Sequence, residues 1–572
     1  MKYRNYSADC YENLRQMLRE SARRFGEKTL FLQKAEGGYS SISYQAFYAD
    51  VCSLGTALLE SGLTGKRIAL MGQNCYLWAL SYMAVVCSGG TVIPLDEEMN
   101  TKDVTGINTL CEINAIICAD SMLEKFSVLG ESVPRILFSD LEMWISRGNR
   151  RIQEGDRRYF DVKIDSRDVC AILFSNRGAD DLRGVMLSHR NLCSNVSEIS
   201  QMVYVDEKDV FLSTLPLYHA YECTCGFLCP MSRGCAIAFS EGLKFLGKEM
   251  KEVSPTVMIS VPSMLDKMYE RLWRHFEDRG AADQIRRMIA MTNSILSQKA
   301  ALVAKKKAFS AIHNSFGGRL RLLISGGTLF DKNTAKGFRD LGISVLQGYG
   351  ITECSPVIAL NRDTCFRDGS VGLCTPNALL DIAEMQEDGV GEIRYRGESV
   401  MVGYYRMPEQ TREVIRDGWF YTGDMGYLDG DGFLYVTGQK KNAIDVGDGK
   451  KIFPEELEAA ICRSSYVKEC VVVGYPDEKR NTTHVVALIY PDLDALAQMY
   501  GTSVSKEQME NALQRVLAEV NGLLPSYKNI ETFLIRDRAF PKTPMQRIRR
   551  AGLAEMHFGA FWDRILQNSK NY

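Results

Sequence analysis

The fold class is set by the stretch from Arg67 to Leu95, which contains two apolar runs, Arg67-Ile68-Ala69-Leu70-Met71-Gly72 and Gly90-Thr91-Val92-Ile93-Pro94-Leu95. The residues between them, 75–88, have the length and composition of a helix. Two short apolar runs joined by a helical segment predict a β-α-β unit with parallel strands. This stretch therefore predicts an α/β fold whose parallel sheets are covered by helices.

The same pattern recurs along the first two thirds of the chain. Apolar runs at 115–118 and 320–325 predict further strands of this kind. Near the N-terminus, Leu14, Met17, Leu18 and Ala22 stand at helical spacing, and we expect the first 30 residues to form an amphipathic helix.

The pattern changes after about Pro376. The runs 391–397 and 432–438 are bounded by glycines and favour antiparallel strands. A polar, basic stretch at 439–442 then precedes a smaller tail, so we place a domain boundary near Gly438. In the tail we expect, in order, a helix at 454–462, strands at 468–473 and 485–490, a helix at 506–517 and a strand at 532–535.

Composition excludes several classes of protein. The 572 residues are 45% apolar and 24% charged, as in an ordinary globular enzyme. The formal net charge is -2, so no global field favours nucleic acid or an anionic membrane. No apolar stretch reaches about 18 residues, and we expect no membrane span.

The cysteines and the N-terminus bear on the compartment. The first residues are polar and charged through Arg24, without the apolar core of a secretion signal. The 17 cysteines are therefore expected to be reduced thiols of a cytoplasmic protein. Cys223, Cys225 and Cys229 are the densest cluster. They lack a second ligand pair nearby, which favours buried small side chains over a zinc site.

The most distinctive polar motif is Gln347-Gly348-Tyr349-Gly350-Ile351-Thr352-Glu353, which follows an apolar run at 343–346. Its glycines, Gly350 among them, let backbone approach a ligand. Thr352 offers a hydroxyl to a phosphate oxygen, and Glu353 a hard carboxylate to Mg²⁺. Taken alone, a turn with a solvated Glu353 is the simpler interpretation.

Three other segments bear on the same chemistry. Ser325-Gly326-Gly327-Thr328 follows a buried strand and forms a backbone-rich floor. In Tyr421-Thr422-Gly423-Asp424, the carboxylate after a Thr-Gly turn can accept two hydrogen bonds from a ribose diol. A basic turn occupies residues 541–550, and a solvated charge run is its alternative interpretation.

In their order and separations, these segments resemble the AMP-binding superfamily of acyl-CoA synthetases, peptide-synthetase adenylation domains and luciferases. The resemblance covers nearly the whole chain. Residues 400–405, residues 450–458 and Cys354-Ser355-Pro356 look most like bacterial long-chain fatty-acid ligases.

The resemblance implies a fold and a domain order. It implies a large N-terminal domain, residues 1–437, built of two α/β sheet subdomains and a small β subdomain. A hinge at 438–442 and a small mobile α+β C-terminal domain at 443–572 would follow.

The resemblance also implies a reaction. A fatty acid would attack the α-phosphate of ATP with Mg²⁺ bound, giving an acyl-adenylate and pyrophosphate. The thiol of coenzyme A would then take the acyl group and release AMP, after the C-terminal domain has rotated.

Family roles carry over to matching positions of this chain. Thr352 would contact the α-phosphate, Glu353 the magnesium and Asp424 the ribose. Adenine would be framed by Gly326, Gly327 and Tyr349. The hinge position would be Lys441. His219 matches a residue beside the acyl pocket, and a structural histidine with satisfied hydrogen bonds is the equal alternative.

The chain departs from the family at the phosphate-binding loop, which is expected to be rich in serine, threonine and glycine and to end in Pro-Lys-Gly. Residues 184–189 fix its register, and the loop runs from Ser175 through Gly178 to Arg183, which replaces the lysine. Asp180 and Asp181 stand where a polyphosphate is expected. At an effective dielectric of about 20, a like charge 4 Å away costs about 4 kcal/mol before screening.

Two more positions differ from the family. Gln439 replaces an arginine after the small β subdomain, and Arg547 replaces the catalytic lysine near the C-terminus, with Gln546 before it. Arginine keeps the charge of lysine but is planar and forked, so the exchange is not conservative.

These substitutions leave three hypotheses open. The first is a fatty-acid–CoA ligase that adenylates its substrate. The second is an impaired paralogue on the same scaffold with a binding or regulatory role. The third is an adenylating enzyme that loads a separate acyl carrier protein. The basic Lys450-Lys451 pair, near the expected pantetheine tunnel, favours coenzyme A, although it fits a solvated face as well.

Overall fold

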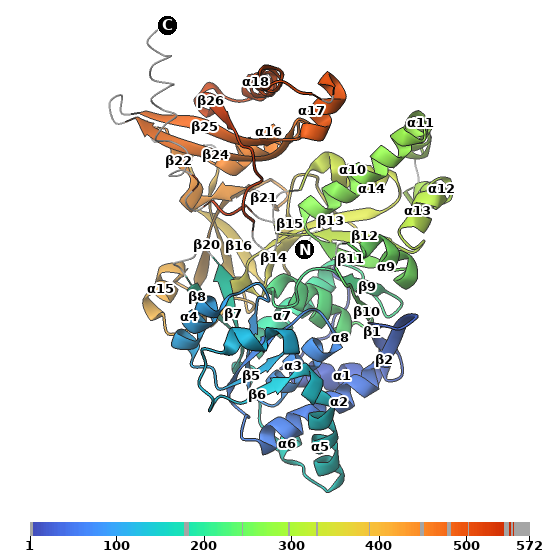
Figure 1. Ribbon diagram of the computed structural model, residues 1–572, viewed down its shortest axis with the longest axis vertical. Coiled ribbons are helices and arrows are strands. Elements are labelled where there is room, and N and C mark those ends of the chain that lie inside the picture. The colour runs from blue at the N-terminus through green and yellow to red at the C-terminus, as the bar shows by residue number, and fades with distance from the viewer. Residues whose placement is uncertain are drawn as a thin grey trace. The chain divides into compact units, whose positions relative to one another are not determined.

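The computed structural model describes residues 4–176, 182–242, 244–295, 298–327, 330–387, 389–446, 451–477, 482–501, 503–542, 548–550 and 553. The chain divides into two compact units (Figure 1). Unit 1 comprises Met1–Asp381, Arg394–Tyr421 and Asp429–Leu434, and unit 2 comprises Ile382–Ile393, Thr422–Leu428 and Tyr435–Tyr572. The ranges 1–437, 438–442 and 443–572 stay a prediction.

The first sheet of unit 1 contains the predicted β-α-β unit. Its strand order is β18 (Gly403–Tyr404), β8 (Leu182–Ser188), β7 (Val169–Asn176), β4 (Thr91–Leu95), β3 (Arg67–Met71), β5 (Ala115–Cys118) and β6 (Arg135–Leu137). Strands β7, β4, β3, β5 and β6 are parallel, and α3 (Tyr76–Cys87) joins β3 to β4. The prediction from residues 67–95 is confirmed. Strands β8 and β18 add an antiparallel edge.

Helices accompany this sheet along the chain. They are α1 (Leu14–Phe25), α2 (Tyr44–Glu60), α4 (Thr101–Cys111), α5 (Leu141–Gln153), α6 (Arg158–Asp161) and α7 (His189–Met202). The predicted apolar face of α1 is buried. The helix begins only at Leu14, because the Asn13 side chain caps it by accepting from the Gln16 amide. Residues 4–13, placed in the same helical region by the sequence, are not helical.

The second sheet of unit 1 also has a parallel central run with antiparallel strands at its edges. Its order is β15 (Gly372–Cys374), β14 (Val357–Leu360), β13 (Ser344–Gly350), β12 (Leu322–Ser325), β11 (Val257–Ser260), β9 (Val210–Ser213), β10 (Ala236–Phe239), β1 (Thr29–Ala35) and β2 (Gly38–Ser43). The run from β13 to β1 is parallel, and β14, β15 and β2 are antiparallel.

The helical elements that alternate with this sheet are η3 (Glu222–Leu228), α8 (Cys229–Ser232), α9 (Leu246–Val253), α10 (Pro262–Asp278), α11 (Ala282–Asn293), α12 (Gln298–Ala308), α13 (Ser310–Ser315), α14 (Lys332–Asp340) and η4 (Thr352–Cys354). The glycine-bounded strands predicted after Pro376 are present. Four strands contain residues of both units: β16 (Leu379–Ala383), β17 (Gly391–Arg396), β20 (Trp419–Leu428) and β21 (Phe433–Gln439). Helix α15 (Pro408–Val414) and strand β19 (Ile415–Arg416) lie in unit 1.

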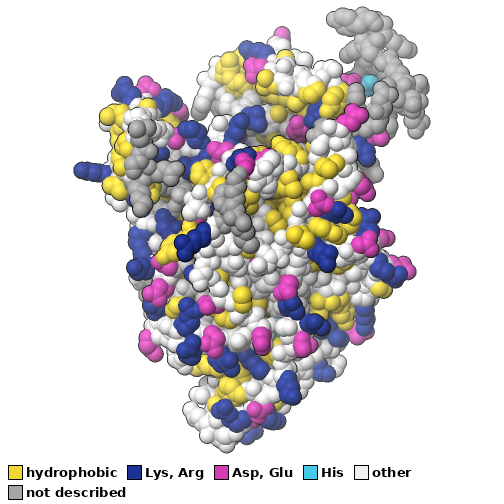
Figure 2. Space-filling model, turned by 180° about the vertical axis from the view of Figure 1, so that it is seen from behind, with side chains coloured by type: hydrophobic (Ala, Val, Ile, Leu, Met, Phe, Trp, Pro, Cys, Tyr) yellow, Lys and Arg dark blue, Asp and Glu magenta, His cyan; other side chains and the backbone are white. Residues whose placement is uncertain are grey.

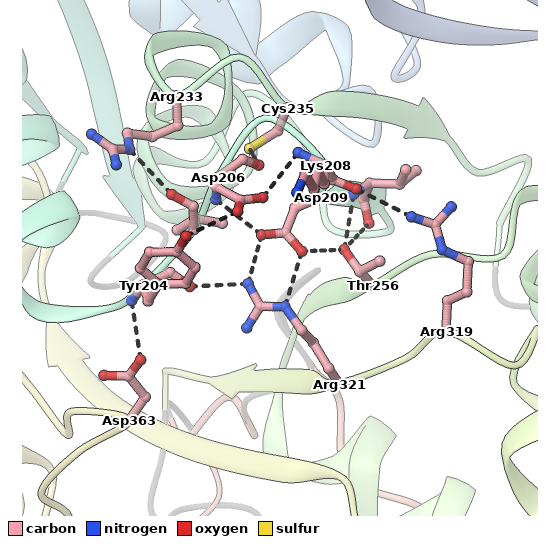
Figure 3. A network of polar contacts seen from close by, with 12 residues as sticks. Tyr204, Asp206, Lys208, Asp209, Arg233, Cys235, Thr256, Arg319, Arg321 and Asp363 are labelled. Carbon is pink, nitrogen blue, oxygen red and sulfur yellow. Dashed lines mark hydrogen bonds and ion pairs between the residues drawn. The ribbon is translucent and has the colours of Figure 1, made fainter. Parts of the chain in front are cut away.

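A network of hydrogen bonds and an ion pair connects the amino ends of β9, β11 and β12 (Figure 3). Asp209, Thr256 and Arg321 each stand immediately before one of these strands. The Asp209 carboxylate accepts from Arg321 Nη2 at 2.6 Å and Nε at 2.9 Å, and from Thr256 Oγ1 at 2.7 Å. Arg321 Nη2 also donates to the Tyr204 carbonyl at 3.0 Å. Because the buried carboxylate is paired, this end of the sheet carries no isolated charge.

Unit 2 has its own core. It contains η5 (Lys440–Asn442), β22 (Ile444–Asp445), β23 (Lys451–Ile452), α16 (Pro454–Ile461), β24 (Val467–Asp477), β25 (Thr482–Pro491), α17 (Leu493–Tyr500), α18 (Lys506–Gly522), η6 (Ser526–Lys528) and β26 (Thr532–Ile535). Leu457, Val472, Leu513 and Leu517 pack in one apolar cluster. The expected helices and strands of this tail are confirmed, and α18 runs five residues beyond the expected end at 517.

All 17 cysteines are free thiols. Cys223, Cys225 and Cys229 are buried, and burial raises the pKa of each thiol. The interpretation of this cluster as small buried side chains is confirmed. No helix in the described part of the chain has both the length and the apolarity needed to cross a bilayer.

Candidate active site

Glu353 is the best-defined polar group of the predicted phosphate site. It lies in η4, just beyond the carboxyl end of β13, and is only 2% exposed. Tyr404 Oη donates to Glu353 Oε1 at 2.9 Å, and the Met401 amide donates to the Glu353 carbonyl at 2.8 Å. The interpretation of this residue as a solvated turn glutamate is wrong, because the short β18 strand closes over it.

Two glycines of the motif lie close to the neighbouring strand, and backbone packing requires a glycine at Gly350. A Cβ at Gly350 would lie 2.3 Å from the Pro356 carbonyl oxygen, and one at Gly348 would lie 2.9 Å from Leu360 Cδ1. Both positions face strand β14, which folds back along β13. The glycines therefore let β14 approach, and this approach sets the direction in which Thr352 and Glu353 follow the strand.

Arg183, which stands in place of the family's lysine, lies next to this group. It is in β8, paired opposite Ser175 of β7. Its guanidinium carbon is 5.2 Å from the centre of the Tyr404 ring, within range of a cation–π interaction. Arg183, Tyr404 and Glu353 thus form a continuous series from the end of the predicted phosphate loop to the predicted magnesium ligand. Gly178 and residues 177–181 of the loop, and the Ser175 side chain, lie outside the described residues.

Helix α7 positions the segments that carry this series. Asn191 Nδ2 donates to the carbonyls of Glu398 at 2.7 Å and Val400 at 2.8 Å. Asn195, four residues later on the same face, donates to the Val357 carbonyl at 2.8 Å and accepts from the Val357 amide at 3.1 Å. The sequence interpretation gave these asparagines no role. Their spacing of four residues in a buried helix was the available signal.

The predicted adenine floor is built around Gly326. A Cβ there would lie 2.7 Å from Tyr221 Cζ, and Tyr221 Oη donates to the Ile324 carbonyl at 3.3 Å. Gly327 has φ +101°, which favours glycine. Tyr349 lies in β13 and Thr328 outside the described residues. The His219 ring lies 4.8 Å from the Tyr218 ring, which leaves both interpretations of His219 in place.

Asp424 forms a second polar cluster, in unit 2. It is buried in β20 directly after Gly423, whose φ is +72°, so the expected Thr-Gly turn is a kink within a strand. Gln439 Nε2 donates to Asp424 Oδ1 at 3.0 Å, and the Asp424 amide donates to Thr422 Oγ1 at 3.1 Å. Gln439 therefore orients the carboxylate without adding the charge of an arginine.

The predicted hinge is tied to other parts of unit 2. Lys440 Nζ donates to Glu392 Oε2 at 2.7 Å and to Glu384 Oε2 at 3.1 Å. Asn442 Nδ2 donates to Glu455 Oε1 at 2.5 Å. Lys441, the residue matched to the hinge, is exposed in η5 between these two attachments.

The basic turn is partly described. Arg547 and Gln546 lie outside the described residues. Lys542 Nζ lies 2.5 Å from Glu469 Oε1, and Arg550 pairs with Glu458. The interpretation of this turn as a solvated charge run is wrong at Lys542 and Arg550, because acidic side chains of β24 and α16 pair with them.

The geometry brings the predicted residues together in two groups. Unit 1 joins Glu353, Tyr404 and Arg183, and unit 2 joins Asp424 and Gln439. The convergence of both groups on one nucleotide stays a prediction. Among the described residues, no three His, Cys, Asp or Glu side chains gather as a metal site.

Two protein-family models match most of the chain. The family model described as "AMP-binding enzyme" matches residues 18–405, and the model described as "AMP-binding enzyme C-terminal domain" matches residues 441–560. The chain is 26% identical over 584 residues to long-chain-fatty-acid–CoA ligase 5 of Mus musculus, covering 91% of this chain and 84% of that protein.

Two further similarities concern the acceptor and the fold. The chain is 25% identical over 587 residues to the long-chain-fatty-acid–[acyl-carrier-protein] ligase AEE15 of Arabidopsis thaliana, covering 87% of this chain and 79% of that protein. Among solved structures, ATP-bound MatB from Rhodopseudomonas palustris superposes with a TM-score of 0.75 at 22% identity, covering 95% of this chain and 98% of that one. At that identity the superposition establishes the fold alone.

Proposed function

Because this chain belongs to the AMP-binding enzyme family, we propose that it is an AMP-forming acyl-CoA ligase that activates a long-chain fatty acid with ATP. The acid would be adenylated first and then transferred to coenzyme A. The similarity to long-chain fatty-acid–CoA ligases over nine tenths of the chain supports this substrate class.

The observation that carries the proposal is the series Arg183–Tyr404–Glu353, in which Tyr404 and Glu353 are buried and Arg183 is partly exposed. A carboxylate that is 2% exposed and held by a tyrosine hydroxyl is preorganised. Preorganised charge stabilises a developing charge without reorganisation during the reaction. Arg183 adds a cation whose guanidinium carbon lies 5.2 Å from the centre of the Tyr404 ring, on the strand that follows the predicted phosphate loop.

Magnesium fits Glu353 as its protein ligand. A carboxylate is a hard oxygen donor, and Mg²⁺ commonly binds through one or two carboxylates together with substrate phosphates. When bound, the ion would neutralise phosphate charge.

Asp424 and Gln439 would bind the ribose. The Asp424 carboxylate accepts a hydrogen bond from Gln439 Nε2 at Oδ1, and a carboxylate is the group that commonly accepts from ribose hydroxyls at nucleotide sites. The arginine of the family would add a phosphate contact that glutamine cannot make. We therefore infer weaker nucleotide binding than in relatives with arginine, without loss of the ribose ligand.

The decisive experiment measures pyrophosphate release from MgATP with fatty acids of eight to eighteen carbons, with and without coenzyme A. Release that depends on acid and on Glu353 supports adenylation, and Glu353→Gln is expected to abolish it. Glu398→Gln, an exposed residue of the same unit, is the matched control. Tight ATP binding with no release for any acid would contradict the ligase proposal and favour the impaired paralogue.

Two added arms separate the remaining alternatives. Replacing coenzyme A by a phosphopantetheinylated acyl carrier protein tests the acceptor, for which the similarity to AEE15 provides the reason. An Arg547→Lys variant tests the substituted catalytic position. A large gain of pyrophosphate release in that variant would mean that arginine limits adenylation.

A further inference from the structure

The chain as a whole is close to neutral, yet one segment is strongly basic. Residues 279–308, which include α11 and α12, contain seven basic residues and a single acidic one, Asp283. The whole chain has a formal net charge of -2. The charge count of the full sequence therefore conceals a local positive surface.

Exposed apolar side chains stand on the same two helices and on the segment between them. Met291 at the end of α11 is 71% exposed, and Val303 in α12 is 68% exposed. Ile295 and Leu302 are also more than one third exposed. Large apolar side chains that gather in solvent mark contact surfaces more often than isolated ones do.

The two most exposed apolar residues each have a cation one helical turn away. Arg287 precedes Met291 by four residues, and Lys307 follows Val303 by four. Residues four apart lie on the same face of a helix. In the view of Figure 2, hydrophobic and basic side chains lie side by side on the lobe formed by α11 to α13. The surface is thus apolar and cationic at once.

Some of these basic side chains already have partners within the protein. Arg286 pairs with Asp283 and lies over the Trp273 ring, and Lys305 Nζ donates to the Arg339 carbonyl. Arg287, Lys306 and Lys307 differ, since the described part of the chain places no acidic side chain within ion-pair distance of them. These three cations are available to an external anion.

We propose that α11 and α12 dock this protein on an anionic lipid surface. Lysine and arginine stems can lie along the apolar boundary while their charges reach the phosphates. Apolar side chains flanked by cations on one helix face are the pattern of helices that lie in the membrane interface. Charge complementarity selects anionic lipid over a neutral bilayer.

The docking surface would serve substrate supply. This role of the docking surface rests on the proposed function, because long-chain fatty acids partition into bilayers and a docked ligase would meet them there. Docking itself needs neither ATP nor acid, so the two proposals can fail separately.

The test is flotation of the purified full-length protein with vesicles of phosphatidylcholine alone, or with about a third phosphatidylglycerol, at low and high salt. The protein is expected to float only with the anionic vesicles and to be released by salt, since about 1 kcal/mol per basic residue is screened. Lys306→Glu combined with Lys307→Glu should lower the partition coefficient at least tenfold. Met291→Ser combined with Val303→Ser should lower it several-fold.

Two matched controls address charge and hydrophobicity elsewhere. Lys102→Glu reverses an exposed lysine on α4, and Leu523→Ser removes a side chain that is 83% exposed in unit 2. Both should float like the parent. Equal flotation with neutral vesicles, no flotation at all, or unchanged flotation of the α12 variant would overturn the proposal. So would lipid-free self-association that the same α11 and α12 variants abolish, because the surface would then join two copies of this chain.

Discussion

At the amino end of strand β9 the carboxylate of Asp209 meets the guanidinium of Arg321, whereas at its carboxyl end the carboxyl of Glu222 meets the hydroxyl of Ser213. Both acids are almost fully buried. Asp209 has a counter-charge and a second donor in Thr256. Glu222 accepts from Ser213 Oγ at 2.6 Å, and its Oε2 has no hydrogen-bond partner among the described residues.

The difference separates a stabilising end of the sheet from a functional one. Burial raises the pKa of Glu222 to about 8, so its carboxyl is held neutral near pH 7. In parallel sheets the carboxyl ends carry ligand sites, and Glu353 follows the same end of β13. Of these two acids, the incompletely paired Glu222 lies at the carboxyl end of the strand, where the proposed function places the substrate, and the fully paired Asp209 lies at the amino end.

Removing the cation that pairs with Asp209 should have the largest effect on the free energy of unfolding. Arg321→Met leaves the Asp209 carboxylate buried without a counter-charge and is expected to destabilise the protein by about 2–4 kcal/mol, since the guanidinium is partly exposed. Urea unfolding measures this. Arg319→Met is the matched control, because Arg319 is exposed and, within the described residues, donates only to the Lys208 carbonyl. Equal losses in the two variants would contradict the role of the network.

Removing the ionisable carboxyl of the unpaired end should act in the opposite direction and stabilise the protein near neutral pH. An unfolded glutamate ionises near pH 4.5, whereas Glu222 stays protonated to about pH 8. The folded state binds the extra proton in this window, so stability is full below pH 4.5 and falls as pH rises to about 8. Glu198 in α7, also raised to about 8 by burial, acts with the same sign.

Glu222→Gln should remove its part of that slope and raise the free energy of unfolding by about 1–3 kcal/mol at pH 7.5. Unfolding curves from pH 5 to 8 measure the slope. Glu131→Gln, at an exposed position, should leave the slope as it is. A Glu222→Gln variant with the parent's slope would show that the carboxyl is ionised in the folded protein.

The role of Tyr404 at the carboxyl end of the sheet can be tested by removing its hydroxyl group. Tyr404→Phe removes the hydroxyl that donates to Glu353 and keeps the ring beside Arg183. We expect pyrophosphate release to fall about ten- to a hundredfold, or about 1–3 kcal/mol, together with a higher magnesium requirement. Tyr405→Phe is the neighbouring control. An equal loss in both variants, with no change in magnesium dependence, would remove Tyr404 from the site.

The smallest expected effect compares two threonines. Thr256→Val removes the hydroxyl that donates to Asp209 and accepts from the Val210 amide, and should cost about 1–2 kcal/mol of stability. Thr214→Val, at the carboxyl end, removes one hydrogen bond to the Ile259 carbonyl and should cost about 0.5–1 kcal/mol. Thermal unfolding of the two variants ranks them, and a reversed order would weaken the contrast between the two ends.

The order of elements could be predicted from local patterns. Apolar runs at 67–71, 91–95 and 115–118 form strands because each is short, apolar and bounded by polar or glycine residues. The start of α1 could not be read from its apolar spacing, since the Asn13 cap decides it. The pairing of Gly403–Tyr404 with β8 was equally hidden, because a two-residue strand has no periodicity.

By itself, the sequence determined the α/β class, most strand positions and the presence of Thr352, Glu353 and Asp424, because these depend on residue type and spacing along one segment. Only the tertiary structure decided that Glu353 is buried under Tyr404, that Arg183 lies beside that ring and that Gln439 holds Asp424. Those contacts join residues 15 to more than 200 positions apart. Burial and pairing are properties of neighbours in space, which no local pattern encodes.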